Sequence, residues 1–452
     1  MKYAILKLMC LTISVVMLFA TVGCGDKSGS QSQGGGSSSG TQQSGTGSNL
    51  SWDELKAKIP ADAKGKTIEV LSWNKITDVT GAQQVVDKFT KETGINVKWT
   101  LFSGGTMADY RTKVVGLVSA KQSPDVVRLE SLHLGMLKAL QPLQDINYNF
   151  NDAAWDKRVM DVYTFGDKTY GTNMRNTLLQ QPRTLIYNKN LINTYDLEDP
   201  YTLWKQGQWT LEKFEEICET FTAECDESSY AWTSYRLSDV ADIYGAPMIK
   251  RDGDNFTLNM NDPNLLKGWQ KMTSLREEGI TNNMRFDRTN FENGKILFFT
   301  ESPIGARTTH FYFQSLKSTG ALAIVPYPTV EGGTDAVVWG EVEAYAIPKG
   351  APNANIVPYF LRYYLDGDNY DKNTFFPDKT ILDVYETLMK TENMFVNYDY
   401  ALITEDVGTT GEKMCHGLIN VKSAQVKTKL DSFAGMVDAA VKNTNGLVAQ
   451  LD

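Results

Sequence analysis

The feature that most constrains the fold of this chain is an alternation of strand-like and helix-like hydrophobic patterns over residues 67–127. Thr67–Trp73 has the composition of a strand, Ala82–Thr93 places its apolar residues on one helical face, and Ile95–Leu101 alternates apolar and polar residues. Met107–Val118 then returns to a helical period, and Pro124–Val127 begins a further strand-like run. Strands alternating with helices are typical of a mainly parallel sheet covered by helices on both faces. We therefore expect an α/β fold.

The length of the chain exceeds what one hydrophobic core supports. About 400 of the 452 residues follow Ser48, enough for two large domains. Strand-like patterns return at Thr184–Asn188, Ala321–Val325 and Val337–Ile347, whereas the middle and the last hundred residues are mainly helical. Because strand-rich stretches lie on both sides of a helical middle, we expect the chain to cross between two lobes more than once.

The first 50 residues have the pattern of a secretion signal followed by a linker. Two lysines precede the apolar run Leu8–Ala20, and the short segment Thr21–Gly23 then leads to Cys24. This pattern resembles a bacterial lipoprotein signal, in which residues 1–23 are removed and the Cys24 thiol is acylated. The alternative is an ordinary signal peptide with an incidental cysteine. The run is shorter than the roughly 18 residues of a membrane span, and the Gly/Ser-rich residues 24–50 predict a flexible linker at the outer face of the cell membrane.

Composition excludes several classes of partner. Removing the signal changes the net charge from −9 to −11, and an acidic surface disfavours nucleic acids and anionic lipid headgroups. His133, His310 and His416 are far apart in sequence and form no metal-ligand pair. The chain has no Gly-x-Ser-x-Gly elbow and no phosphate-binding Gly-x4-Gly-Lys loop. We expect no cofactor and no metal.

Three cysteines remain after Cys10 is removed with the signal and Cys24 is acylated. These are Cys218, Cys225 and Cys415, an odd number that cannot form a complete disulfide framework. Cys218 and Cys225 could pair if the helix that carries the first ends before the second. Buried free thiols are an equal alternative.

Six groups of short motifs, in a fixed order, point to a known family. They are Ser123–Val127, Pro142–Asp145, Leu185–Leu191 with Trp209–Phe214, Phe291–Ile296, Ile324–Pro328 and Ala344–Lys349. In this order and spacing the chain resembles the family 1 extracellular solute-binding proteins, the lipoprotein receptors of carbohydrate-type ABC importers. The resemblance implies a receptor, not an enzyme, with an ABC permease and a mono- or oligosaccharide as partners, and we expect it to be a monomer.

The same resemblance implies a periplasmic-binding-protein-like clamp of two discontinuous lobes joined by hinge strands. We expect residues 51–180 and 300–347 in the N-terminal lobe, and residues 181–299 and 348–452 in the C-terminal lobe. The ligand would lie in the cleft between them, at the carboxyl ends of strands, where open α/β sheets usually bind ligands.

A sugar site needs flat aromatic faces together with carboxylates, amides or arginines that form paired hydrogen bonds. Residues of these kinds lie at strand ends and at the expected lobe crossings. The candidate ligand-binding residues are Trp73, Asn74, Glu130, Ser131, Gln181, Arg183, Trp232, Tyr235, Glu301, Arg307, Trp339 and Glu341.

Most of these candidates also have a purely structural interpretation. Trp73 with Asn74 could be a core tryptophan capped by a turn, and Glu130 with Ser131 could stabilise a helix N-terminus. The polar residues before Leu185 could be hinge hydrogen bonders, and Trp232 and Tyr235 could be ordinary packing residues. Trp339, Glu341 and Glu343 would share one face of a strand, which is either the cleft or a solvated face, and Glu343 ranks lower.

Other functions remain as alternatives. Glu341 and Glu343 would lie about 6.5–7 Å apart along a strand, a spacing that a glycosidase could use, although such pairs are common on solvated strands. A structural lipoprotein or adhesin would not need a two-lobed clamp. A receptor of the same fold for a non-sugar polar solute is the main alternative.

Overall fold

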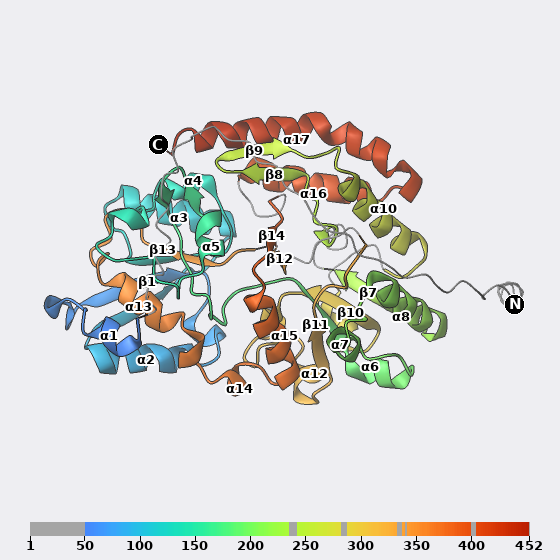
Figure 1. Cartoon of the computed structure of the whole chain (residues 1–452), viewed down its shortest axis with the longest axis horizontal. Helices are drawn as coiled ribbons and strands as arrows, with labels where there is room; N and C mark the ends of the chain where they lie inside the picture. Colours follow the sequence, from blue (N-terminus) through green and yellow to red (C-terminus); the bar gives the residue numbers. More distant parts are fainter. Residues whose placement is uncertain are drawn as a thin grey trace, which may run out of the picture. The chain divides into compact units, whose positions relative to one another are not determined.

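The computed structural model describes residues 50–234, 242–281, 287–331, 337–339, 341–398 and 404–451 (Figure 1). The expected signal peptide, Cys24 and almost all of the linker lie outside these residues, as does the candidate Tyr235. The chain divides into two units, Met1–Thr46 and Gly47–Asp452, and all of the described helices and strands belong to the second. None of the described helices is both long and apolar enough to cross a membrane.

The first sheet has the strand order β13-β3-β1-β2. β1 (Thr67–Ser72) pairs in parallel with β2 (Asn96–Leu101) and β3 (Val126–Leu129), and β13 (Ala344–Ala346) pairs antiparallel with β3. All four residues of β3 are buried, as expected of a strand covered on both faces. The expected alternation of strands and helices in this region is therefore confirmed.

Helices cover the first sheet. α2 (Ala82–Thr93) has the predicted bounds and ends at Gly94, whose φ of 72° is the left-handed conformation that glycine adopts most easily. α3 (Met107–Ser119) begins with a Thr106 capping box. α13 (Val357–Tyr364) packs against α2, with the Phe89 and Phe360 rings 5.4 Å apart.

The second sheet has the order β11-β6-β10-β7. Both β10 (Ile296–Glu301) and β11 (Leu322–Val325) pair antiparallel with β6 (Thr184–Asn188), and β7 (Tyr230–Ser234) pairs in parallel with β10. Every residue of β6, β10 and β11 is buried.

The strand pairing bears on the expected lobe bounds, which remain a proposal. Within residues 300–347, expected in the N-terminal lobe, the end of β10 and all of β11 pair in the second sheet, and β13 pairs in the first. Within residues 348–452, expected in the C-terminal lobe, α13 packs on α2, which follows β1 of the first sheet. Fully buried strands such as β10 and β11 carry no alternation that would indicate which sheet they join.

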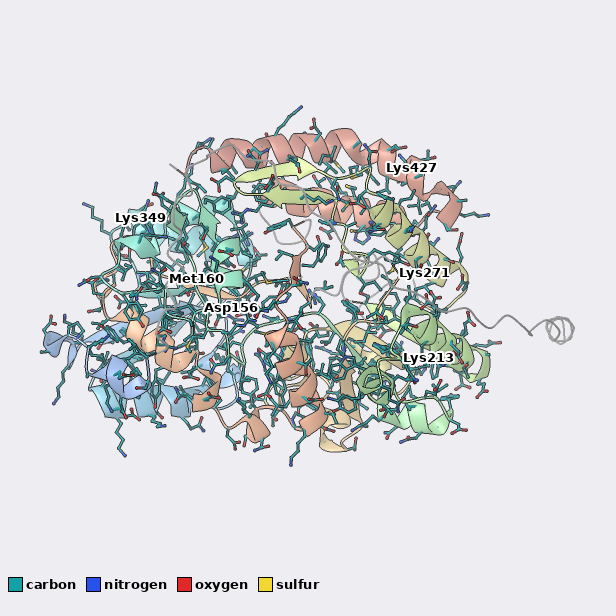
Figure 2. All side chains as sticks on the ribbon, viewed as in Figure 1. Asp156, Met160, Lys213, Lys271, Lys349 and Lys427 are labelled. Atoms are coloured by element: carbon teal, nitrogen blue, oxygen red, sulfur yellow. The ribbon has the colours of Figure 1, made fainter. Side chains whose placement is uncertain are left out.

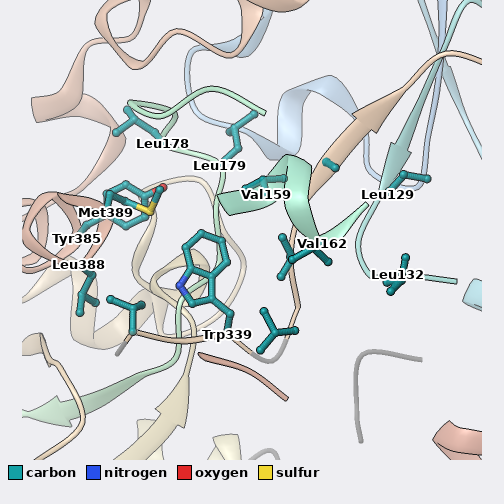
Figure 3. Packing of buried hydrophobic residues seen from close by; sticks show 14 of the residues in the cluster. Leu129, Leu132, Val159, Val162, Leu178, Leu179, Trp339, Tyr385, Leu388 and Met389 are labelled. Carbon is teal, nitrogen blue, oxygen red and sulfur yellow. The ribbon is translucent and has the colours of Figure 1, made fainter. Parts of the chain in front are cut away.

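The expected strand Val337–Ile347 is divided between two sheets. β12 (Val337–Trp339) pairs with β14 (Met394–Val396), whereas β13 pairs with β3 of the first sheet. Trp339, Glu341 and Glu343 therefore do not lie along one continuous strand. Figure 3 shows the Trp339 indole near Val162, Tyr385 and Leu388.

A helical layer extends from the second sheet. It contains α8 (Leu211–Glu224), α10 (Pro263–Glu277), α16 (Glu405–Ile419), α17 (Val426–Val448) and the hairpin of β8 (Ile249–Asp252) and β9 (Asn255–Leu258). Lys271 of α10, labelled in Figure 2, pairs with Glu215 of α8 at 2.8 Å. The Trp232 amide of β7 donates to the carbonyl of Ile280, which follows α10, so this layer is fixed to the edge of the second sheet.

The remaining elements are mostly short. The helices are α1 (Trp52–Lys56), α4 (Leu134–Leu137), α5 (Lys157–Val162), α6 (Lys189–Thr194), α7 (Pro200–Lys205), α11 (Arg288–Glu292), α12 (Gln314–Ser318), α14 (Lys372–Phe375) and α15 (Lys379–Lys390). The 3₁₀ helices are η1 (Ala61–Ala63), η2 (Ile76–Asp78), η3 (Leu143–Asp145), η4 (Pro303–Ala306), η5 (Gly367–Asn369) and η6 (Ser423–Gln425). β4 (Thr164–Phe165) and β5 (Lys168–Thr169) form a two-stranded hairpin.

The cysteine alternatives are resolved in favour of free thiols. Cys218 is buried in α8, Cys225 caps the same helix and is partly buried, and Cys415 is buried in α16. Burial raises the pKa of the Cys218 thiol well above its ordinary value, which keeps the thiol protonated and unreactive.

Candidate functional site

The carboxyl end of β3 carries a buried charge pair. The Arg128 guanidinium donates from Nε to Glu343 at 2.7 Å and makes a second contact with the other oxygen of that carboxylate. The Glu130 carboxylate lies 3.3 Å from Arg128. The Tyr110 hydroxyl donates to the backbone carbonyl of Arg128 at 3.0 Å. The end of the strand is thus held by side chains of both the sheet and α3.

Glu343 connects this strand to the segment that crosses toward the second sheet. It is fully buried, and its carboxylate also accepts from the side-chain amide of Gln181. Its backbone N–H donates to the Gln180 side chain at 3.1 Å, and its carbonyl accepts from Asn173 at 3.0 Å and from Gln180 at 2.8 Å. A buried carboxylate is tolerated when its hydrogen-bonding capacity is filled in this way.

The second sheet contributes a matching pair at the end of β10. Arg183 lies 3.6 Å from the Glu301 carboxylate, which also accepts from the Ser302 backbone N–H at 2.7 Å. The Ser302 hydroxyl donates to the Gln181 side chain at 3.4 Å. Gln181 therefore joins the two charge pairs, which come from different sheets.

The charge of Glu341 acts on one carboxylate of each pair. Burial raises the pKa of Glu130 to about 7, with Arg128 opposing the shift and Glu343 and Glu341 adding to it. Burial also raises the pKa of Glu301, where Arg183 opposes and Glu341 adds. We refer to these seven residues as the polar cluster: Arg128, Glu130, Gln181, Arg183, Glu301, Glu341 and Glu343.

The structure thus brings together five candidates from the sequence. These are Glu130, Gln181, Arg183, Glu301 and Glu341. The cluster contains acceptors, guanidinium donors and an amide, which together can form paired hydrogen bonds with a polyhydroxylated ligand. Among the described residues, no group of three or more metal-ligating side chains is positioned to hold an ion.

Trp73 and Asn74 directly follow β1, the neighbour of β3 in the first sheet. The Trp73 ring is partly exposed, stacks on Phe102 with centroids 5.7 Å apart, and meets the Tyr110 ring edge-on at 6.3 Å. The Asn74 carbonyl accepts from the Trp99 indole at 2.8 Å. Because Tyr110 also holds the backbone of Arg128, one face of Trp73 is supported beside the polar cluster. Ser131 follows Glu130 directly and is also partly buried.

Three other candidates are enclosed by packing. Trp232 is fully buried, and its indole N–H donates to the Thr300 hydroxyl at 2.9 Å within the second sheet. Arg307 is 2% exposed and donates to the Leu178 carbonyl at 2.9 Å. Trp339 is fully buried, with the Arg158 guanidinium 5.6 Å from its ring centroid. The position of Trp232 matches its interpretation as a packing residue, whereas the burial of Trp339 differs from the solvated strand face considered for it.

Two members of the polar cluster lie outside the residues selected from the sequence, Arg128 and Glu343. Arg128 occupies the apolar run Val126–Leu129, and a charge within a buried strand requires an opposite charge nearby. That rule could have identified Arg128 from the sequence. From the sequence, Glu343 ranks below Glu341, although the one strand expected there would place both on the same face.

Two cavities lie near elements of the second sheet. One, of about 190 Å³, is bordered by Arg183, Trp204, Trp209 and Tyr327, so it joins an arginine of the polar cluster to aromatic rings. The motif Ile324–Pro328 could have drawn attention to Tyr327. The other cavity, of about 690 Å³, lies between α5, the β8–β9 hairpin and the β14 region. None of the sequence candidates lines it, and no local sequence signal marks it.

Comparison with known proteins identifies the family. Residues 73–367, well over half of the chain, match the family model described as bacterial extracellular solute-binding protein. No curated protein matches the sequence.

Several solved structures share the fold at low identity. The galacto-N-biose-/lacto-N-biose I-binding protein of the ABC transporter from Bifidobacterium longum has a TM-score of 0.62 and 15% identity, covering 84% of this chain and 97% of that one. The cyclic α-maltosyl-1,6-maltose binding protein from Arthrobacter globiformis gives 0.62 and 14%, covering 83% and 99%. Maltose-bound T. maritima MalE3 gives 0.59 and 15%, covering 82% and 99%. The expected α/β periplasmic-binding-protein fold is confirmed.

Proposed function

Because the chain belongs to the bacterial extracellular solute-binding protein family, we propose that it captures a sugar or oligosaccharide outside the cell and delivers it to an ABC permease. Members of the family are receptors for small solutes and not enzymes. The carbohydrate is the proposed part, and its principal support is the convergence of Glu130, Gln181, Arg183, Glu301 and Glu341 in one polar cluster.

The chemistry of the cluster supports a polyhydroxylated ligand. Carboxylates accept from sugar hydroxyls, and guanidinium and amide groups donate to them. Trp73, supported by Phe102 and Tyr110, offers an aromatic face for the apolar C–H surface of a sugar ring. Lacto-N-biose and maltose are the ligands of two of the structural neighbours.

We further propose that capture proceeds by closure of two lobes. The strand pairing supports a first lobe that includes β13 and α13 and a second that includes β10 and β11. Arg128 belongs to the first sheet, Glu301 to the second, and Gln181 to the segment between them. A ligand that binds both sides would favour the closed arrangement by its differential affinity for that state.

The location rests on the N-terminal pattern. We propose that Cys24 is acylated after removal of residues 1–23, and that residues 24–50 tether a monomeric receptor to the outer face of the cell membrane. Mass spectrometry of the protein extracted from membranes tests this, because acylated Cys24 would be the new N-terminus. An unmodified mature chain in the culture medium would contradict the anchor.

A thermal-shift screen of the mature protein against mono- and oligosaccharides, polyols, amino acids and short peptides tests the ligand class. A bound ligand stabilises the folded state by RT ln(1 + [L]/Kd), about 2.7 kcal/mol at a hundredfold excess. We expect a shift with one saccharide family and recovery of that saccharide unchanged. A shift only with a non-sugar solute would refute the carbohydrate assignment, and a cleaved saccharide would indicate a hydrolase.

Site variants then test the location. Glu130→Gln and Glu301→Gln are each expected to weaken sugar binding at least about tenfold, since each replaces a carboxyl group of the site with an amide. Glu69→Gln is the matched control, because Glu69 lies on β1 of the same sheet and pairs with exposed Lys98. Equal affinities for all three variants would place the site elsewhere.

A further inference from the structure

The β8–β9 hairpin reaches from the helical layer of the second sheet to elements of the first. On its own side it is fixed by α17, because the Phe256 backbone exchanges two hydrogen bonds with the Asn445 side chain, at 2.8 and 2.9 Å. The layer that holds it is attached to the second sheet through α10 and Ile280. The hairpin is therefore part of the second sheet's assembly.

The tip of the hairpin binds the segment that runs from α5 into the β4–β5 hairpin. The Arg251 guanidinium donates to the carbonyl of Val162 at 2.7 Å and to the carbonyl of Thr164. It also lies over the Phe165 ring, 4.1 Å from the centroid. In the turn of the hairpin, the Asp254 carboxylate accepts from the Gly166 backbone N–H at 2.8 Å.

The segment on the opposite side is fixed to the first sheet. The Tyr163 hydroxyl donates to the Val342 carbonyl at 2.6 Å, just before β13. The Thr169 N–H donates to Gln144, which follows α4, at 3.0 Å. A second connection accompanies the hairpin, where Lys138 after α4 donates to Gln450 beyond the end of α17 at 2.8 Å. Both contacts thus join the two assemblies.

This contact also encloses space. The cavity of about 690 Å³ has Lys250, Arg251 and Asp254 of the hairpin on one wall, and Asp161 and Thr164 of the α5–β4 segment on another. The contact consists of hydrogen bonds and one cation–π interaction, which water can replace at a small net cost in free energy. Such a contact can open and re-form more easily than a packed apolar core.

We propose that the β8–β9 hairpin is a latch, in which Arg251 and Asp254 hold the two lobes together across this cavity and stabilise the closed receptor. The proposal rests on the proposed lobe closure, but not on the identity of the ligand. When the latch is fastened, Arg251 covers the carbonyl groups at the end of α5. When it opens, those carbonyls and the guanidinium are exposed to water.

The test measures the distance between the lobes without ligand. Spin labels are placed at Lys98→Cys on β2 and Lys295→Cys before β10. In the mature protein, a Cys225→Ser background leaves, besides the N-terminal Cys24, only the buried Cys218 and Cys415. Electron–electron double resonance then gives the distance distribution. Arg251→Ala is expected to shift it to longer distances and to speed ligand dissociation about tenfold.

Arg276→Ala is the matched control. The Arg276 guanidinium also donates to a backbone carbonyl at 2.8 Å, that of Val421, but within the helical layer. We expect it to leave the distance distribution unchanged. Asp254→Ala removes only the carboxylate bound to Gly166, and it provides the test if Arg251→Ala fails to fold. An unchanged distribution in the folded latch variants would overturn the latch, whereas a receptor that binds no sugar would refute only the ligand assignment.

Discussion

Replacing Glu343 by alanine is expected to destabilise the protein by about 3–5 kcal/mol, because it breaks a buried ion pair by removing one partner. Glu343 is fully buried, and Arg128, 6% exposed, donates to it with two nitrogens. Without Glu343 the guanidinium keeps only Glu130, 3.3 Å away, and the Gln181 amide loses its acceptor. The loss would be a large fraction of the roughly 5–15 kcal/mol that usually stabilises a folded domain.

Urea unfolding of the ligand-free protein, followed by tryptophan fluorescence, measures this loss. The double variant Arg128→Met/Glu343→Leu should recover much of the stability, since it leaves no uncompensated buried charge. Asp62→Ala is the control: its ion pair with Lys66 is short, at 2.7 Å, but exposed, so the unfolding midpoint should not move. A Glu343→Ala variant within about 1 kcal/mol of the parent would refute the assignment of Glu343 as a buried, charge-compensating residue.

Three further variants probe protonation and packing. The pKa of Glu130 is raised from 4.5 to about 7, so the folded state binds this proton more tightly than the unfolded state. The free energy of unfolding should therefore fall as pH rises from about 4.5 to 7. Glu130→Gln should flatten this pH dependence, measured by urea unfolding. Burial and the charges of Arg307 and Lys317 lower the pKa of His310 from 6.5 to about 3, so stability should be lost as pH falls below 6.5, and His310→Asn should remove that loss. Trp232→Phe should cost about 1–2 kcal/mol by leaving the Thr300 hydroxyl unpaired, without changing ligand affinity in calorimetry.

The local structure of the first sheet could be predicted because its strands and helices alternate over short distances in the sequence. Residues 67–129 alternate strand and helix, and each strand pairs with a neighbour from the same stretch. α2 could even be bounded, since Gly94 adopts the left-handed conformation that ends it. These signals are local, and sequence patterns record local structure well.

The sheet to which β10 and β11 belong could not be predicted, because it depends on pairing between distant segments. β6 is separated from β10 by about a hundred residues and from β11 by more, and all three are buried along their whole length. A strand of that kind has no polar face to indicate its neighbours. The break between β12 and β13 also defeats the period-two argument that links Trp339 to Glu343.

The candidate site could be predicted best where residues follow or end a strand. Glu130 and Glu301 lie at the carboxyl ends of β3 and β10, positions that open α/β sheets use for ligands. Trp232 lies within β7 instead, and the side of a strand on which a residue lies is set by sheet register and packing. Aromatic character alone therefore does not distinguish a core residue from a binding platform.

The polar cluster contains side chains of both sheets and of the segment between them. Arg128 is fixed by β3, Glu301 by β10, and Gln181 bonds to both Glu343 and Ser302 from the segment between them. A ligand that replaces these contacts must form hydrogen bonds or ion pairs with side chains of both sheets, because a buried charge left unpaired is costly. In the site that we propose, binding and lobe position are coupled through these side chains, so weakening the Gln181 link should alter the affinity for the ligand.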